Sequence, residues 1–248
     1  MKIGSINEDL NLEKRISITP LMAKKITELG LEIFINENYS KHLGINDNEY
    51  NSIGVNILKD KKEVIKNSDL SLLINFPEVE CMNFFKEDSS VIGIFNLQSS
   101  REKINLLIDR KVNIFSMDLL PRITRAQPMD VLSSQANLAG YKAAIEAINR
   151  FEKVVPMMMT AAGTIPAARV LVIGAGVAGL QAIATAKRLG SVVFATDVRL
   201  ASKEQVESLG GKFLTVESFE DLETETGYAK EAGKDFKLKQ EELLKTTL

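Results

Sequence analysis

Residues 170–179 read Val-Leu-Val-Ile-Gly-Ala-Gly-Val-Ala-Gly, an apolar run that leads directly into the spacing G-x-G-x-x-G. Val170–Ile173 predicts a strand, and Leu180–Leu189 predicts a helix after the turn. In this context the first glycine permits a tight turn, the second lets the backbone approach a pyrophosphate, and the third lets the helix pack close to the strand. The helix start adds N–H groups that favour phosphate. The pattern predicts a dinucleotide-binding turn made of Gly174, Ala175, Gly176, Val177, Ala178 and Gly179. The alternatives are a turn that binds nothing, or one that binds another adenosine ligand.

An acidic residue closes the next predicted strand, Val192–Ala195. Asp197 stands 18 positions after Gly179, where a carboxylate can accept hydrogen bonds from ribose hydroxyls. The same charge would repel a 2′-phosphate, which favours NAD over NADP. Arg199 could instead contact a phosphate. The candidate cofactor contacts here are Asp197, Val198 and Arg199.

The second half of the chain predicts an unfinished sheet. A helix over Lys203–Leu209, capped by Ser202, precedes a third strand over Lys212–Val216, and no strand signal follows. In the common strand order 3-2-1-4-5-6, the first strand would lie beside the fourth. Val170–Ile173 is therefore expected at an apolar sheet edge, a surface that pairs readily with other chains. We expect either a fragment or a sheet that a second polypeptide completes.

The first half alternates strand and helix signals, which favours a parallel sheet covered on both faces. Thr19 and Pro20 mark the start of a helix over Leu21–Leu29, and Gly30 its end. A second helix is expected over Lys61–Asn67. The apolar runs read as strands are Lys2–Ile6, Leu31–Ile35, Ser68–Ile74, Val91–Ile94, Lys111–Phe115 and Met117–Leu119. The fold class is α/β, with two Rossmann-like doubly wound parallel-sheet domains, the second incomplete. Expected boundaries are 1–128 for the first domain, 129–151 for a bridging helix and 152–248 for an NAD(H)-binding domain.

Composition excludes several classes of protein. The chain has 248 residues, of which 45% are hydrophobic and 26% charged, as in an ordinary soluble domain. Its net charge of -2 argues against a nucleic-acid partner. The single cysteine, Cys81, cannot close an intramolecular disulfide, and the single histidine, His42, makes histidine metal sites and triads improbable. The longest uncharged stretch, Val170–Ala186, spans 17 residues and is too short for a bilayer. We expect no metal site and no direct membrane insertion.

A dense polar run, Pro121–Asn137, enters the bridging helix. Its donors and acceptors Arg122, Gln127, Asp130 and Ser133 could hold a nicotinamide carboxamide. The alternative is a capped helix with a solvated first turn, in which Asp130 is an ordinary first-turn acid.

Several motifs together resemble one family. Arg122–Tyr141, Met157–Gly163, the glycine turn and Ala195–Arg199 closely resemble the NAD-binding domain of proton-translocating NAD(P) transhydrogenase alpha subunits. Glu13–Pro20 resembles the opening motif which that family shares with alanine dehydrogenase. The resemblance covers essentially the whole chain, and in the family the nucleotide domain continues with further strands.

The resemblance implies a role for each matching residue. Arg122, Gln127, Asp130 and Ser133 would surround the nicotinamide, with Gln127, Arg122 and Asp130 as the candidates nearest the reaction. Gly174, Gly176 and Gly179 would hold the pyrophosphate and Asp197 the ribose. Tyr228, within Gly227–Lys230, would lie on a mobile loop that closes over the nucleotide.

The implied reaction passes a hydride from NADH to NADP+ held on a partner domain, coupled to proton translocation. This transfer needs positioning and exclusion of water rather than a general base. The implied partners are the NADP(H)-binding and membrane domains of the transhydrogenase, together with a second copy of the chain. The implied location is the cytoplasmic face of the inner membrane, peripherally, through partner subunits.

Two other functions stay open. An alanine-dehydrogenase-like oxidoreductase would need the lysine and histidine that related enzymes carry, whereas this chain has Asn75 and Asn96 at the corresponding positions. Arg15 is present but could be an ion-paired structural residue, and His42 falls in a polar region that we expect to be exposed. The second alternative is a non-catalytic or truncated NAD-binding subunit.

Overall fold

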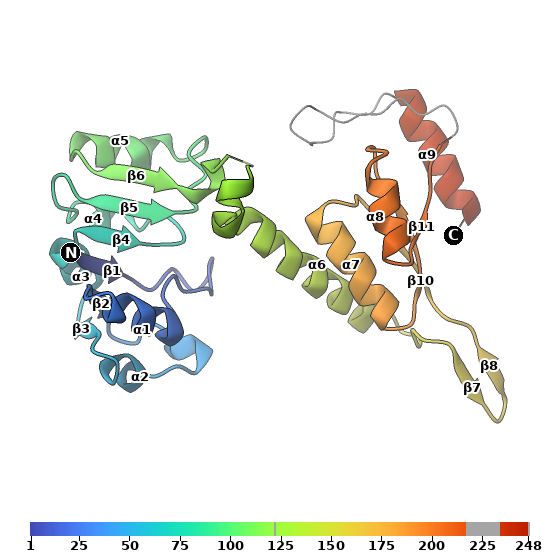
Figure 1. Cartoon of the computed structure of the whole chain (residues 1–248), viewed down its shortest axis with the longest axis horizontal. Coiled ribbons are helices and arrows are strands. Elements are labelled where there is room, and N and C mark those ends of the chain that lie inside the picture. Colours follow the sequence, from blue (N-terminus) through green and yellow to red (C-terminus); the bar gives the residue numbers. More distant parts are fainter. Residues whose placement is uncertain (122, 217–233, 248) are drawn as a thin grey trace. The chain divides into compact units, whose positions relative to one another are not determined.

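The computed structural model describes residues 1–121, 123–216 and 234–247, and the chain divides into two compact units, Met1–Asp130 and Val131–Leu248 (Figure 1). The long helix α6, Val131–Arg150, belongs to the second unit. The expected boundaries at 128/129 and 151/152 stay predictions. Each unit is considered by itself below.

The first unit is built on a six-stranded parallel sheet in the order β3-β2-β1-β4-β5-β6. This is the doubly wound order 3-2-1-4-5-6, so the predicted α/β class is confirmed. The strands are β1 Lys2–Ser5, β2 Glu32–Asn36, β3 Asn56–Leu58, β4 Leu70–Leu72, β5 Ser90–Gly93 and β6 Asn113–Ser116.

Both faces of this sheet are buried, as the sequence predicted. Ile33 and Ile35 on β2 belong to one apolar cluster, whereas Phe34 between them packs against another. Successive side chains of a strand point to opposite faces, so each face has its own core. The covering helices are α1 Pro20–Glu28, α2 Asp47–Asn51, α3 Lys61–Asn67, α4 Val79–Met82 and α5 Arg101–Asp109.

The predicted start and end of the first helix are confirmed. The Thr19 hydroxyl accepts the backbone N–H of Met22 at 3.3 Å, Pro20 is the first residue of α1, and Gly30 follows with φ 76°. The reading of Met117–Leu119 as a strand is wrong, because these residues form a 3-10 turn, η2, directly after β6. The other 3-10 turns of this unit are η1 Lys41–Leu43 and η3 Thr124–Met129.

The described part of the second unit has a three-stranded parallel sheet in the order β11-β10-β9. Among the described residues, β9 pairs with β10 alone, and Ile173 at its end is 72% exposed. The expected apolar edge is therefore present. Besides α6, the elements are β7 Met158–Thr160, β8 Gly163–Ile165, β9 Arg169–Ile173, α7 Val177–Arg188, β10 Val192–Thr196, α8 Ser202–Ser208, β11 Lys212–Phe213 and α9 Lys234–Thr247.

Several boundaries in this unit differ from expectation, among them the start of α7, which lies at Val177 instead of Leu180. Ser202 is the first residue of α8 rather than its cap, because Ala201 precedes it in helical conformation. The third strand ends at Phe213 instead of Val216. The long helix begins at Val131, since Met129 belongs to the 3-10 turn η3 that precedes it. No helix within the described ranges combines the length and hydropathy that a bilayer crossing requires.

The helices α6 and α7 of the second unit approach each other at Gly140. This glycine is buried, and a Cβ atom added there would lie 2.0 Å from the carbonyl oxygen of Ala178. Only a residue without a side chain allows this approach, which fixes the first turn of α7 against α6.

Gly140→Ala is therefore expected to lower the free energy of unfolding by about 1–3 kcal/mol, because the methyl group overpacks a rigid backbone contact. Helix propensity alone predicts the opposite sign, a gain of about 1 kcal/mol. Urea unfolding followed by circular dichroism measures the difference. Ala139→Leu, at the exposed neighbouring position on α6, is the control and should shift stability by less than about 0.5 kcal/mol. A stabilised Gly140→Ala variant would contradict the close approach.

Tyr39 anchors the core of the first unit. It is fully buried, its hydroxyl lies 2.7 Å from the Ser5 hydroxyl, and it accepts the backbone N–H groups of Ser17 and Ile18 at 3.1 and 3.0 Å. Burial raises the pKa of Tyr39 to about 12, although these hydrogen bonds oppose the shift.

The free energy of unfolding should consequently fall as the pH rises from about 10 to about 12. In this range the unfolded chain releases the phenolic proton and the folded chain retains it, which favours unfolding. Two pKa units correspond to a loss of about 2–3 kcal/mol. Urea titrations at pH 8, 9, 10 and 11 measure the slope, and Tyr39→Phe, although less stable at pH 8, should show a shallower decline above pH 10. Parallel curves for the two proteins would refute the assignment to Tyr39.

Candidate functional site

The glycine turn of the second unit adopts the geometry that its sequence predicted. Gly174 follows β9 directly with φ 92°, and its N–H donates to the carbonyl oxygen of Thr196 at 2.8 Å. A Cβ atom at Gly179 would lie 1.8 Å from the Gly174 carbonyl oxygen, so the start of α7 closes tightly onto the strand end. Gly176 is the N-cap of α7, and the first turn of any helix leaves N–H groups without intrahelical partners.

Asp197 joins this turn to the end of β10. Its Oδ2 accepts the backbone N–H of Ala175 at 2.7 Å and Nη2 of Arg199 at 2.9 Å. Its Oδ1 accepts the backbone N–H and Nε of Arg199 at 2.8 and 2.9 Å. The Asp197 side chain is 5% exposed and that of Arg199 20%. The acid and the turn therefore form one hydrogen-bonded unit at the carboxyl ends of two neighbouring parallel strands.

This environment keeps the carboxylate ionised. Burial disfavours the charge, but the hydrogen bonds from the Arg199 side chain, the Ala175 amide and the Arg199 amide outweigh it and lower the pKa of Asp197 below its ordinary value. An anion fixed beside a glycine turn can accept hydroxyl hydrogen bonds and repels phosphate.

The structure describes most of the polar run that leads into α6. Gln127 is exposed on the 3-10 turn η3, and Asp130 is half-buried and caps that turn. Both line a small hollow in the first unit of about 260 Å³. Ser133 is half-buried in the first turn of α6, in the second unit. The two remaining candidates, Arg122 and Tyr228, lie outside the described residues.

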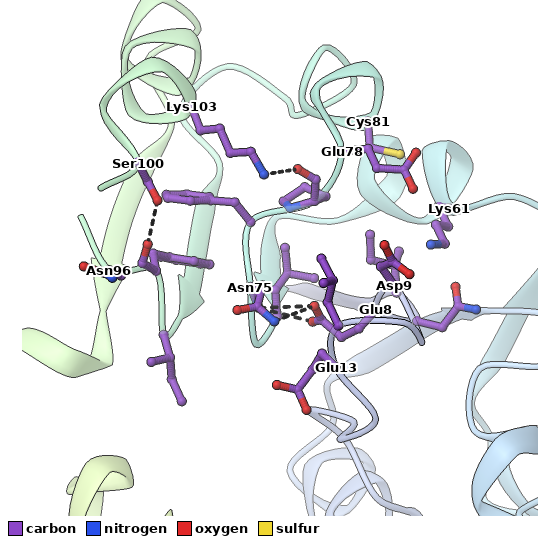
Figure 2. Close-up of a pocket in the computed structure, with 18 of the residues that line it drawn as sticks. Glu8, Asp9, Glu13, Lys61, Asn75, Glu78, Cys81, Asn96, Ser100 and Lys103 are labelled. Atoms are coloured by element: carbon purple, nitrogen blue, oxygen red, sulfur yellow. Dashed lines mark hydrogen bonds between the residues drawn. The ribbon is translucent and has the colours of Figure 1, made fainter. Parts of the chain in front are cut away.

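A larger cavity, of about 460 Å³, opens in the first unit beyond the carboxyl ends of β1, β4 and β5 (Figure 2). Asn75 and Asn96 line it, and Asn75 donates its backbone N–H to the Glu8 carboxylate at 3.2 Å. Glu8 also accepts the Ile74 N–H at 2.7 Å, and burial raises its pKa despite these bonds. Neither asparagine can exchange a proton near neutral pH.

The other residues of the alanine-dehydrogenase alternative have local partners. Arg15 Nη2 forms an ion pair with Glu13 Oε2 at 2.6 Å, and Arg15 Nε binds the same carboxylate at 2.9 Å. His42 is exposed, as expected, and its Nε2 lies 2.7 Å from the Lys14 carbonyl oxygen. In the described part of the chain, no three His, Cys, Asp or Glu side chains lie close enough together to hold a metal ion.

Sequence reasoning missed three features near these sites. It did not pair Arg199 with Asp197, although a spacing of two residues after a strand is a visible signal. It did not find the stacked rings of Phe76 and Phe95, whose centroids lie 4.1 Å apart beside the first-unit cavity. It also missed the α9 contact in which Gln240 Nε2 donates to the Thr196 hydroxyl at 2.9 Å, because nothing in the sequence indicates that long-range pairing.

Comparison with known proteins supplies the family. The alanine dehydrogenase/PNT N-terminal domain matches residues 4–139, and the alanine dehydrogenase/PNT C-terminal domain matches residues 143–247. The chain belongs to the alanine dehydrogenase/PNT family, as the motifs predicted.

Two curated relatives carry the name of the first part of NAD(P) transhydrogenase subunit alpha. The protein from Rickettsia prowazekii is 45% identical over 98% of this chain and 65% of its own length, and that from Rhodospirillum rubrum is 44% identical over 100% and 68%. A solved structure of transhydrogenase from Sinorhizobium meliloti is 43% identical, with a TM-score of 0.82 over 87% of this chain and 64% of that one. This chain thus spans about two thirds of the length of these relatives.

Proposed function

We propose that this chain is the NAD(H)-binding component of a proton-translocating transhydrogenase, and that it presents NADH for hydride transfer to NADP+ on a partner domain. The observation that carries the proposal is the buried Asp197 carboxylate, hydrogen-bonded at 2.7 Å to the glycine turn. The names of the relatives, transhydrogenase subunits at 44–45% identity, support the same reaction.

The residues of the second unit fit an adenine dinucleotide. Gly176 would leave the turn open for a pyrophosphate, since among the described residues a Cβ atom there would approach only Arg199 Nη2, at 3.8 Å. The N–H groups at the start of α7 would face the phosphates. Asp197 would accept the hydroxyls of the adenosine ribose, and its charge favours NAD(H) over NADP(H).

We assign the remaining roles by resemblance to the family. Arg122, Asp130 and Ser133 would orient the nicotinamide, Gln127 would lie towards the partner nucleotide, and Tyr228 would close the site. NADH supplies the hydride when it is bound. The residues of the chain would then position the ring and exclude water, and no side chain needs to remove a proton.

The proposal includes an assembly. An NADP(H)-binding domain and a membrane domain would be the partners, and two copies of this chain would associate. The chain would lie at the cytoplasmic face of the inner membrane through those partners, and hydride transfer would be coupled to proton translocation.

The main alternative is a subunit that binds NAD(H) without taking part in transfer. An alanine-dehydrogenase-like activity is disfavoured because Asn75 and Asn96 occupy the positions of the acid–base residues.

One assay separates the three functions. The chain is mixed with an NADP(H)-binding domain, and NADH-dependent reduction of an NADP+ analogue is followed. Turnover that requires this chain supports the proposal. Binding of NADH without turnover contradicts it and supports the binding subunit. Alanine-dependent reduction of NAD+ contradicts it in favour of the dehydrogenase.

Gln127→Asn tests the ring-positioning role directly. Shortening the side chain by one methylene should slow transfer by roughly tenfold to hundredfold, because small misplacements are costly in a positioned reaction. The Kd for NADH should change much less, since the contact matters mainly in the transition state. Rate and Kd are measured on the same preparation. Gln98→Asn, at an exposed position, is the control and should change neither. Equal losses in rate and affinity would remove the assignment.

A further inference from the structure

The helix α9 contacts the rest of the second unit through one face. Within residues 238–246, the side chains of Gln240, Leu243 and Leu244 are half-buried and the others are exposed. Residues three and four positions apart lie on the same side of a helix, so these three form one narrow contact face. Most of the surface of α9 in this range therefore faces solvent.

The polar residue of this face binds the last residue of β10. Gln240 Nε2 donates to the hydroxyl oxygen of Thr196 at 2.9 Å, and Thr196 is 3% exposed. The side chains of Val193 and Ala195 on β10 pack in the apolar core with α7 and α8. Because successive side chains of a strand point to opposite faces, the Thr196 side chain lies on the other face of the sheet. Helix α9 therefore approaches the face that points away from α7 and α8 (Figure 1).

Thr196 is also part of the nucleotide turn. Its carbonyl oxygen accepts the N–H of Gly174 at 2.8 Å, and the next residue, Asp197, accepts the N–H of Ala175 at 2.7 Å. Thr196 thus accepts one hydrogen bond from the turn on its main chain and another from α9 on its side chain. A change that orders the end of β10 therefore favours both contacts.

We propose that α9 is coupled to the nucleotide turn through Gln240 and Thr196, so that docking of α9 and binding of a nucleotide stabilise each other. Gln240 is a positioning residue, because it acts on the site through Thr196. Both events restrict the same strand end, and the first to occur reduces the conformational entropy that the second must lose. The effect is reciprocal, since linkage requires the same factor in both directions. The inference rests on the proposed binding of NAD(H) at this turn.

The geometry favours cooperation over competition. The N–H groups that would face the phosphates belong to the first turn of α7. Helix α9 contacts the opposite face of the sheet, through the side chain of Thr196. Phosphates bound at the turn therefore do not require α9 to leave.

Hydrogen–deuterium exchange of α9 measures the coupling. Saturating NADH is added to the original chain, and mass spectrometry follows amide exchange in peptides that cover Lys234–Thr247. Exchange should become at least about fivefold slower with NADH, which is the lower end of ordinary coupling between two sites. Unchanged exchange would overturn the proposal. Faster exchange would mean that the nucleotide displaces the helix, and it would overturn the proposal as well.

Two variants assign the effect to the hydrogen bond. Thr196→Val removes the acceptor with little change in shape, and Gln240→Leu removes the donor. Each should weaken NADH binding by about fivefold and abolish the NADH-dependent protection of α9. The double variant should bind NADH no more weakly than either single variant, because both changes remove the same interaction. Additive losses of affinity, or protection that survives in the variants, would refute the role of this pair.

The control is Gln205→Leu, the same substitution at an exposed position of α8, which should change neither affinity nor exchange. Calorimetry of NADH with the original chain separates this inference from the proposed function. No heat of binding refutes the proposed function together with the coupling. NADH binding that leaves α9 unprotected refutes the coupling alone.

Discussion

The second unit depends on one hydrogen bond, from the Ala175 amide to the Asp197 carboxylate, 2.7 Å long and buried. It ties the turn after β9 to the end of β10 and holds an ionised acid where two parallel strands finish. Burial alone would raise the pKa of Asp197 and disfavour its charge. The hydrogen bonds from Arg199 offset this effect and help to keep the carboxylate ionised. Gly174 contributes a positive φ of 92°, whereas Gly179 and Gly140 allow backbone approaches that a side chain would prevent.

Local chemistry made much of this predictable. Thr19, Pro20 and Gly30 marked the first helix because capping and φ preferences act within a few residues. The glycine turn was visible because its spacing is itself the backbone requirement. The apolar edge at β9 followed from counting strands against the doubly wound order, and the described strands have it. The family followed from the long polar run and the turn together.

The rest depends on contacts that a sequence does not display. Asn56–Leu58 is too short to read as a strand from its sequence, and its pairing with β2 decides it. Met117–Leu119 is apolar enough for a strand, but these residues form a 3-10 helix directly after β6. The first-unit cavity collects Glu8, Asn75 and Asn96 from three separate strand ends, which only the sheet order brings together. The roles of Gln127, Asp130 and Ser133 stay predictions, carried by resemblance.

The proposed function depends on recognition of the adenosine ribose by Asp197. Isothermal titration calorimetry of NADH against the chain and against Asp197→Ala measures it most directly. The account predicts measurable binding to the chain and a loss of about 1–3 kcal/mol in the variant, the cost of a buried hydroxyl without its acceptor. Equal affinities for the two proteins, or no heat of binding to either, would contradict it.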